Sequence, residues 1–285
     1  MNKQIKVAIL GSGNIGIDLL MKVIKSKNLL CILVSGKNFS SKGIIIAKRK
    51  GIQTSDQGIK AIMKIKDNLD IVFDATSASA HLIHAKLLKK TNIKIIDMTP
   101  SGVGKPVVPV INKEKLFASK NVNMITCGGQ ASLPIINAIS NISKQIEYIE
   151  VVSSIASKSA GPATRANIDE YIKSTENGIK LFSKTKEAKV ILILNPAKPP
   201  INMQTSISLI INDPDIELLK QSVKHIANEV KQYVPGYELI LEPTEVVKDR
   251  VMVMVKTTGL GDYLPSYAGN LDIINSAAIA VAEKL

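Results

Sequence analysis

Cys127 is the side chain in this sequence best suited to nucleophilic chemistry. It follows a short apolar strand expected at 122–125 and precedes Gly128, Gly129 and a helical pattern from about Ala131. A thiol at the start of a helix lies near unpaired backbone N–H groups and the positive end of the helix dipole, and both favour the thiolate. The two glycines would leave their N–H groups free to hold an oxyanion. A small core cysteine beside a turn accounts for the same local pattern equally well.

A glycine-rich turn near the N-terminus predicts a dinucleotide site. It follows an apolar strand at 7–10 and opens a helix, and it consists of Gly11, Ser12, Gly13, Asn14, Ile15 and Gly16. The three glycines would make the bend, admit a pyrophosphate to the backbone and let the helix close on the strand. A tight turn without a ligand is the alternative. No acid for the adenosine ribose follows the second strand, where Lys37 is found instead, so the choice between NAD and NADP stays open.

A loop of small and hydroxyl side chains is the second candidate for ligand contact. It begins at Ser157, leads into a helix near residue 164, and contains Ser159, Ala160, Gly161, Pro162, Ala163, Thr164, Arg165, Ala166 and Asn167. Backbone donors and hydroxyls before a helix suit an anionic or carbonyl ligand, although the loop could simply be a connection. Arginine is rare in this chain, so Arg165 suggests a planar donor, with a surface ion pair as the alternative.

Two further segments follow predicted strands at the edge where a parallel sheet binds ligands. The segments 74–80 and 98–104 are rich in small residues and are expected to line the cofactor cleft. A helix N-cap formed by Ser77 or Ser79 explains the first of them equally well.

Composition argues against several classes of protein. The formal net charge is +13, but 34 of the 37 basic residues are lysines scattered along the chain without interleaved aromatic residues, which disfavours a nucleic-acid partner. No apolar run is long enough to span a membrane, and the N-terminus does not resemble a signal peptide. Cys31 and Cys127 form no metal-type or disulfide-type spacing. We therefore expect a cytoplasmic protein without a structural metal.

The order of apolar patterns predicts two kinds of domain. Strands at 7–10, 29–34, 71–73, 93–97 and 122–125 alternate with helices at 16–25, 43–50 and 79–90, which indicates a Rossmann-type, doubly wound parallel sheet. Strands at 149–154, 190–194, 207–211, 238–241 and 251–255, with helices at 165–182 and 214–233, indicate an α+β domain with a mostly antiparallel sheet. We expect an NAD-binding domain at 1–128, a catalytic domain at 129–265 and a C-terminal helix at 266–285 that packs back on the first domain.

A thiol combined with a nicotinamide-binding fold predicts aldehyde oxidation. The thiolate would add to an aldehyde, and loss of hydride would leave an enzyme thioester. Water, phosphate or coenzyme A could then resolve that thioester. Phosphorylating enzymes commonly place a histidine beside the thiol, whereas His81, His84 and His225 fall on predicted helices that do not suggest this role.

Motifs spread along the chain resemble those of the acylating acetaldehyde dehydrogenases. They are 7–16 (VAILGSGNIG), 72–81 (VFDATSASAH), 121–131 (NVNMITCGGQA), 157–169 (SKSAGPATRANID), 195–200 (NPAKPP), 233–237 (YVPGY) and 263–272 (YLPSYAGNLD). The resemblance implies oxidation of acetaldehyde or propanal with NAD and coenzyme A, with Cys127 as the acyl-thioester nucleophile. It also makes the 12–15 turn, the 159–167 loop and Asn270 cofactor contacts. Further implications are a glyceraldehyde-phosphate-dehydrogenase-like arrangement, a dimerisation role for the second domain, a homodimer, a 4-hydroxy-2-oxovalerate aldolase partner and a place in aromatic hydrocarbon catabolism.

Two departures from that family leave alternatives open. Thr205 stands where the family carries an acid thought to act as a base, and the segment between Leu241 and Tyr263 is shorter than usual. Asp169 could replace the base, although a helix-surface role is the simpler reading. The alternative functions are a phosphorylating semialdehyde dehydrogenase or acyl-phosphate reductase, and a weakly catalytic NAD-binding subunit that scaffolds an aldolase.

Overall fold

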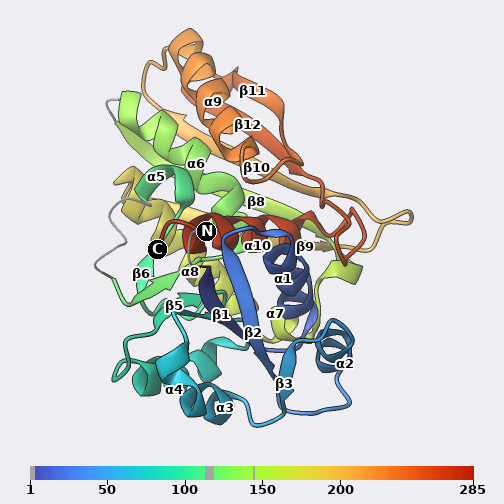
Figure 1. Ribbon diagram of the computed structural model, residues 1–285. Helices are drawn as coiled ribbons and strands as arrows, with labels where there is room; N and C mark the ends of the chain where they lie inside the picture. Colours follow the sequence, from blue (N-terminus) through green and yellow to red (C-terminus); the bar gives the residue numbers. More distant parts are fainter. Residues whose placement is uncertain (1–3, 113–118, 144) are drawn as a thin grey trace. The chain divides into compact units, whose positions relative to one another are not determined.

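The computed structural model describes residues 4–112, 119–143 and 145–285, which form two compact units (Figure 1). The first unit comprises 1–124, 262–264 and 274–285, and the second comprises 125–261 and 265–273. Each unit is described by itself. The domain boundaries expected from the sequence, at 128/129 and 265/266, stay a prediction.

The first unit is built on a parallel sheet of seven strands in the order β3-β2-β1-β4-β5-β7-β6. The strands are β1 (Ile5–Leu10), β2 (Leu29–Ser35), β3 (Gln53–Ser55), β4 (Ile71–Asp74), β5 (Lys94–Asp97), β6 (Lys105–Pro106) and β7 (Asn121–Asn123). The strand order reverses direction between β1 and β4, which is where a doubly wound sheet binds its ligand beyond the carboxyl ends of its strands. The predicted Rossmann-type sheet is confirmed.

Helices complete the first unit: α1 (Asn14–Lys25), α2 (Lys42–Arg49), α3 (Ile59–Lys64), η1 (Lys66–Asn68), α4 (Ala78–Leu88) and α5 (Pro109–Asn112). Alternate side chains of each strand face opposite sides of the sheet. On one side, Ala8 and Leu10 of β1 form a buried cluster with Ile62 of α3 and Leu88 of α4. Burial of these apolar side chains is the main force that fixes each helix on the sheet, since isolated short helices are marginal in water.

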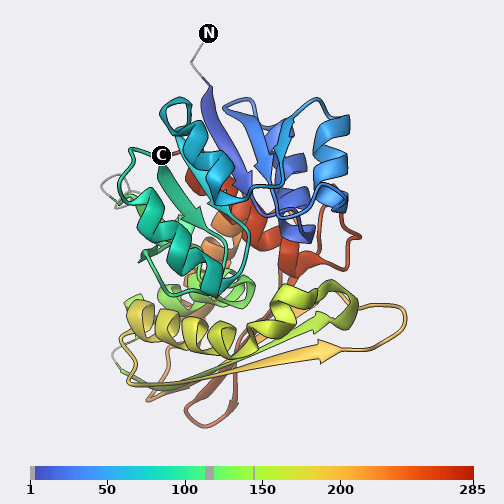
Figure 2. The same ribbon diagram turned by 90° about the horizontal axis from the view of Figure 1, so that it is seen from below.

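The second unit is a five-stranded sheet in the order β11-β12-β10-β8-β9, in which only β8 and β9 pair in parallel. Its strands are β8 (Ile146–Ala156), β9 (Glu187–Asn195), β10 (Met203–Ile211), β11 (Tyr237–Val247) and β12 (Arg250–Thr257). The helices α6 (Cys127–Ile142), α8 (Ile168–Ser183) and α9 (Ile216–Lys231) pack together and against the sheet, and Figure 2 shows α8 lying along it. The predicted α+β unit with a mostly antiparallel sheet is confirmed.

Three local details differ from the sequence expectation. The helix expected from about Ala131 begins at Cys127, because Thr126 caps it: the Thr126 Oγ1 accepts a hydrogen bond of 2.8 Å from the Gly129 N–H. The helix expected at 165–182 is divided at Asn167 into α7 (Pro162–Ala166) and α8. A short 3-10 turn, η3 (Ser157–Ser159), precedes α7. The elements β3, α3, β6 and α5 are not expected from the sequence, because each has too few residues to show a clear hydrophobic period.

The C-terminal helix α10 (Gly269–Ala282) divides between the two units at residue 273/274. Its later part belongs to the first unit, where the Asn275 Nδ2 donates hydrogen bonds to the Asp18 carboxylate at 2.9 Å and to the Ile15 carbonyl at 3.2 Å. This helix therefore braces the first turn of α1. Among the described residues, no helix is long and apolar enough to cross a membrane.

Candidate active site and nucleotide site

The glycine-rich turn lies at the carboxyl end of β1 and leads directly into α1. Gly11 has a φ of +120°, and a Cβ on it would lie 2.4 Å from the Ala75 carbonyl oxygen. A Cβ on Gly16 would lie 2.1 Å from the Gly11 carbonyl oxygen. Both positions therefore require glycine for backbone packing. Gly13 is different, since a Cβ there would meet no described atom within 4 Å.

The open space at Gly13 marks the N-terminus of α1. Gly13 and Asn14 are exposed, and the first turn of α1 carries no acidic side chain. Free N–H groups at a helix N-terminus with no nearby carboxylate favour an anion such as a pyrophosphate.

The Ser12 side chain is held between the first two strand-to-helix connections. A Cβ on Gly36 would lie 2.5 Å from the Ser12 Oγ, and the Ser41 Oγ donates a hydrogen bond of 2.9 Å to the same oxygen. Gly36 therefore makes room for Ser12, and the two connections fix each other.

Two aspartates end neighbouring strands of the first unit, where Asp74 of β4 and Asp97 of β5 are paired in register. Both are fully buried. Each carboxylate holds the loop that follows it: Asp74 Oδ1 accepts from the Thr76 Oγ1, and Asp97 Oδ1 accepts from the N–H and Oγ1 of Thr99 at 2.8 and 2.7 Å. The segments 74–80 and 98–104 are thus anchored by their own strand ends.

His81 of α4 links the two aspartates. Its Nδ1 lies 2.9 Å from Asp74 Oδ2, and its Nε2 lies 3.3 Å from Asp97 Oδ2. His84 Nδ1 also contacts Asp74 Oδ2, at 2.8 Å. Both histidine side chains are therefore held by aspartate carboxylates of the first unit. Ser77 caps the same helix by accepting from the Ala80 N–H at 3.3 Å, as predicted for one of the two serines.

The buried network shifts the two carboxyl groups in opposite directions. Burial would raise the pKa of Asp74, but hydrogen bonds from His81, His84 and Thr76 lower it to about 2. Burial raises the pKa of Asp97 to about 6, despite the opposing effects of His81, Ser101 and Thr99. One feature of the sequence indicates this cluster: an aspartate ends each of two adjacent strands.

Cys127 is the first residue of α6 and is partly exposed. This position places the thiol at the helix N-terminus, as predicted, but burial raises its pKa instead of the expected lowering. The Gly129 N–H has a partner, however, because it donates a hydrogen bond of 2.8 Å to the Thr126 Oγ1. The expectation that both glycine N–H groups are free for an oxyanion is therefore wrong for Gly129.

Tyr171 of α8 brings a phenol hydroxyl to the thiol. The Cys127 Sγ and Tyr171 Oη are 3.9 Å apart, and Tyr171 is 6% exposed. A Cβ on Gly128 would lie 2.1 Å from that Oη and 2.9 Å from the Ser153 Oγ, so glycine makes room for both hydroxyls. Burial raises the pKa of the Cys127 thiol to about 11, while the hydrogen bonds from Tyr171 and the Gly128 backbone act to lower it. No feature of the sequence identified Tyr171.

Thr205, which stands at the expected position of an acid, is fully buried on β10. Its Oγ1 lies 3.2 Å from the Ser153 Oγ, and the two residues are register partners on β10 and β8. Asp169 is exposed and lies two residues before the inward-facing Tyr171 on α8.

The loop that ends at Asn167 is held by internal hydrogen bonds. The Arg165 guanidinium donates to the Ala160 carbonyl at 3.0 Å and to the carbonyl and hydroxyl of Ser157 at 2.9 Å each. Arg165 therefore holds the loop together. This role of its guanidinium differs from the two roles expected from the sequence, a donor to a ligand and a surface ion pair. Asn167 Nδ2 donates to the Ala163 carbonyl at 2.6 Å. Ser159 is buried and donates to the Ala156 carbonyl at 2.8 Å.

Asn270 lies near the start of α10, in the part that belongs to the second unit. It is 1% exposed, and its Oδ1 has no hydrogen-bond partner within the described part of the chain. A buried carbonyl oxygen without a donor is uncommon, and a ligand N–H is one group that would satisfy it.

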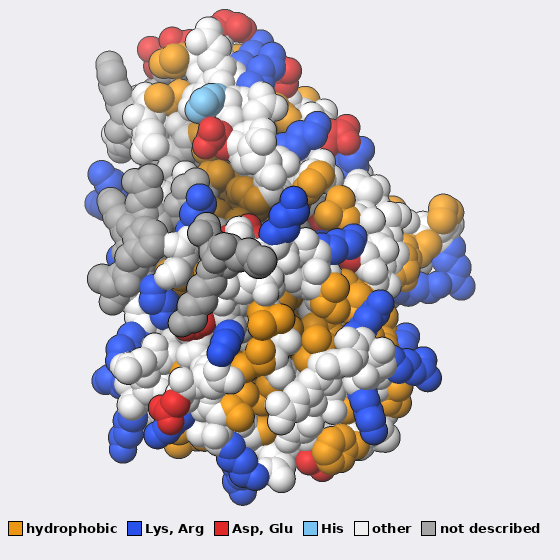
Figure 3. Space-filling view, in the orientation of Figure 1, with side chains coloured by type: hydrophobic (Ala, Val, Ile, Leu, Met, Phe, Trp, Pro, Cys, Tyr) orange, Lys and Arg blue, Asp and Glu red, His pale blue; other side chains and the backbone are white. Residues whose placement is uncertain are grey.

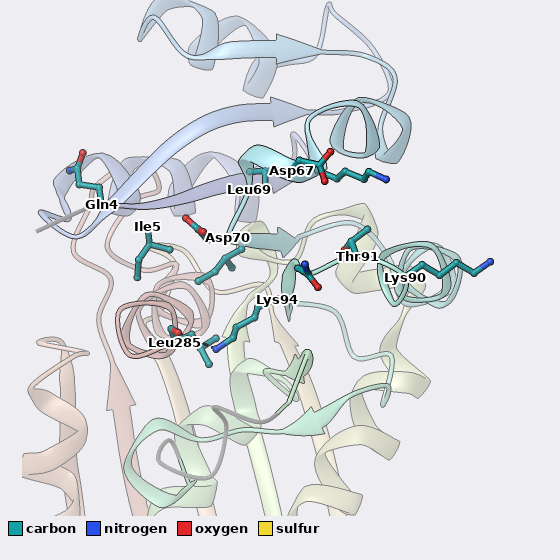
Figure 4. A pocket seen from close by; sticks show the side chains of 12 residues that line it. Gln4, Ile5, Asp67, Leu69, Asp70, Lys90, Thr91, Lys94 and Leu285 are labelled. Carbon is teal, nitrogen blue, oxygen red and sulfur yellow. Dashed lines mark hydrogen bonds between the residues drawn. The ribbon is translucent and has the colours of Figure 1, made fainter.

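The surface adds two observations. Figure 3 shows Lys and Arg side chains distributed over the visible face with Asp and Glu among them. A hollow lined by Ile5, Asp70, Lys94 and Leu285 lies at the amino ends of β1, β4 and β5 (Figure 4). This is the edge of the sheet opposite to the glycine-rich turn, so the hollow is separate from the nucleotide site.

Among the described residues, no cluster of three or more His, Cys, Asp or Glu side chains could hold a metal ion.

Comparison with known proteins gives the family. Residues 127–265 match the model of the family described as prokaryotic acetaldehyde dehydrogenase, dimerisation. An acetaldehyde dehydrogenase of Pectobacterium atrosepticum is 53% identical, and the alignment covers 100% of this chain and 97% of the relative. Acetaldehyde dehydrogenases of Spirochaeta aurantia and Geobacillus stearothermophilus are 48% and 46% identical, each over 99% of this chain and over 95% and 96% of the relatives. The chain therefore belongs to the prokaryotic acetaldehyde dehydrogenase family, as its sequence motifs predicted.

Proposed function

We propose that this protein is an acylating aldehyde dehydrogenase that converts acetaldehyde or propanal, coenzyme A and NAD to acyl-CoA and NADH. The observation that carries the proposal is a partly exposed thiol at the first residue of α6, in a chain of this family. Cys127 is the proposed nucleophile.

Two features of the chain fit a dinucleotide. The exposed N-terminus of α1 has open space above Gly13 and no acidic residue, which suits a pyrophosphate held by residues 11–16. The unpaired Oδ1 of Asn270 suits the N–H of a carboxamide. The loop 159–167 supplies further proposed contacts. Bound NAD supplies the acceptor for the hydride that leaves the aldehyde carbon.

The proposed chemistry uses one covalent bond to the protein. The Cys127 thiolate attacks the aldehyde carbon to give the alkoxide of a thiohemiacetal, and loss of hydride from that carbon leaves an acyl thioester on Cys127. The sulfur of coenzyme A then attacks the acyl carbon, releasing acyl-CoA and restoring the Cys127 thiolate. Coenzyme A gives up its thiol proton in this exchange. Thr205 cannot accept that proton as a carboxylate would, so we propose that it leaves to solvent.

Replacement of Cys127 by serine tests the proposal. We expect NADH formation from acetaldehyde and coenzyme A to fall by roughly a thousandfold or more, because serine is a far weaker nucleophile at neutral pH. Cys31→Ala is the matched control, because Cys31 is 6% exposed on β2 and should not affect turnover. Unchanged NADH formation in Cys127→Ser would contradict the proposal. If phosphate replaced coenzyme A in the parent protein, the enzyme would be phosphorylating instead.

We also propose two assemblies. The matched family model is described as a dimerisation region, which supports a homodimer formed through the second unit. The sequence resemblance supports a 4-hydroxy-2-oxovalerate aldolase as a second partner. Co-purification of the two proteins from a strain that expresses both would test that partnership, and elution of the aldolase alone would contradict it.

A further inference from the structure

We propose that the Tyr171 hydroxyl, backed by Ser153 and Thr205, is a positioning group that donates a hydrogen bond to the Cys127 sulfur in its thiolate form. This inference rests on the proposed role of Cys127 as the nucleophile. It gives Thr205 a function that does not require an acid.

The first step of the argument is the packing around Gly128. The Tyr171 ring comes from the second turn of α8, and its Oη lies 3.9 Å from the Cys127 Sγ. The 2.1 Å separation between that Oη and a Cβ on Gly128 means that only glycine after Cys127 admits the phenol. The phenol is 6% exposed, so water competes little for its hydrogen bonds.

The second step is the continuity of the hydroxyl groups. A Cβ on Gly128 would lie 2.1 Å from the Tyr171 Oη and 2.9 Å from the Ser153 Oγ, so these two hydroxyls lie beside the same backbone position. The Ser153 Oγ lies 3.2 Å from the Thr205 Oγ1. Ser153 and Thr205 are each 0% exposed. Linked in this order, the three buried hydroxyls from α8, β8 and β10 would make a chain that ends at the thiol.

The third step is that this chain has two orientations. With Cys127 as a thiol, the S–H donates to Tyr171, whose O–H donates to Ser153. When the thiol proton leaves to water, each hydroxyl keeps its own hydrogen and turns, so that Thr205 donates to Ser153, Ser153 to Tyr171, and Tyr171 to the sulfur. Hydrogen bonds to a charged acceptor are stronger than those between neutral groups, and aligned donors polarise one another. The chain therefore favours the thiolate without containing a charge.

The experiment is the pH dependence of iodoacetamide alkylation of Cys127 in the full chain. Tyr171→Phe removes only the hydroxyl, and we expect the apparent pKa of the reactive thiol to rise by about one pH unit, with alkylation near pH 8 slowed about tenfold. Ser153→Ala and Thr205→Val should shift the profile in the same direction by smaller amounts. Tyr148→Phe is the matched control, because the Tyr148 Oη contacts Glu150 on the same strand at 3.4 Å, and its profile should equal that of the parent protein.

The signal belongs to one cysteine. Burial raises the pKa of Cys31 to about 12, and Cys127→Ser provides the baseline of alkylation without the reactive thiol. Circular dichroism of each variant reports whether it is folded. If Tyr171→Phe does not fold, Ser153→Ala carries the test, since it leaves the ring packed against Gly128.

The outcomes separate this inference from the proposed function. The inference is overturned if folded Tyr171→Phe has the same pH profile as the parent protein. If Tyr171→Phe does not fold, the same profile in folded Ser153→Ala overturns it. If Cys127→Ser abolishes turnover in that case, the proposed function still stands. If Cys127→Ser retains turnover, the proposed function fails, whatever the alkylation profiles show. An upward shift confined to the three hydroxyl variants supports the inference.

Discussion

At the scale of single residues, Gly13 and Gly16 differ in their surroundings. The space around Gly13 is open to a ligand, whereas Gly16 lies against the Gly11 backbone. We expect Gly13→Ala to leave the free energy of unfolding within about 0.5 kcal/mol of the parent value, because its φ of −81° suits alanine. The same variant should weaken NADH binding about tenfold or more, because the methyl group occupies the space proposed for the pyrophosphate.

Gly16→Ala is the paired control for that prediction. Its Cβ would lie 2.1 Å from a backbone oxygen, so this variant should lower the free energy of unfolding by roughly 1–3 kcal/mol. Urea unfolding and NADH titration of both variants provide the comparison. Parent-like NADH affinity in Gly13→Ala would show that the turn does not hold the dinucleotide.

The reactive thiol shows what residue types alone can and cannot predict. The position of Cys127 at a strand-to-helix turn could be recognised from apolar residues followed by glycines. Its surroundings could not, because Tyr171 and Ser153 are 44 and 26 residues away in sequence. The register of β8 and β10 and the packing of α8 on α6 bring these hydroxyls together. The cap at Thr126, which removes one expected oxyanion donor, is a local feature that the sequence did contain.

At the scale of elements, β4, β5 and α4 share a buried ionisable network with a predictable pH dependence. The folded-state pKa of Asp97 is raised from 3.8 to about 6, so folding favours its protonated form. Its contribution to stability is present at low pH and is lost as pH rises between those values. Asp74 behaves oppositely, since its pKa of about 2 removes stability only below about pH 4. The pKa of His81 is raised, so its contribution is lost at pH values above 6.5.

In the parent protein, we expect the free energy of unfolding to fall by roughly 1–3 kcal/mol as the pH rises from about 4 to about 6. Asp97→Asn should remove this fall. Urea unfolding followed by circular dichroism at several pH values in this range measures it. Asp67→Asn, at an exposed aspartate of the same unit, should keep the parent slope. A parent-like slope in Asp97→Asn would show that Asp97 does not titrate in this range.

Long elements with a strong period could be predicted, and short or divided ones could not. The helix at 216–231 and the strands of the second sheet agree with their patterns because one face of each is buried. The division at Asn167 escaped prediction because 162–166 and 168–183 both consist of residues compatible with helix. The strands β3 and β6 contain only three and two residues. They are strands because they pair with neighbouring strands of the sheet, and their own sequence pattern does not indicate it.

At the scale of the whole molecule, the second sheet has two unlike faces. Val151, Ile207 and Val253 are 0% exposed on the face covered by helices. The alternate side chains face the other way, and one row crosses all five strands through register partners: Ile191, Val152, Ser206, Met254 and Leu241. These five are only partly buried or exposed. This row is apolar except for Ser206, and no helix among the described residues of this unit covers it, so we expect a second copy of the chain to pair through this surface.

Val152→Lys tests that surface because Val152 lies near the middle of the row. A lysine buried between two copies has no partner there, so we expect the dimer dissociation constant to rise about tenfold or more in sedimentation velocity. Leu181→Lys is the control, since Leu181 is 58% exposed on α8 and lies away from this row. Its dimer should match that of the parent protein. Equal dissociation constants for Val152→Lys and the parent protein would place the dimer contact elsewhere on the second unit, and dissociation in Leu181→Lys alone would place it on the side of the helices.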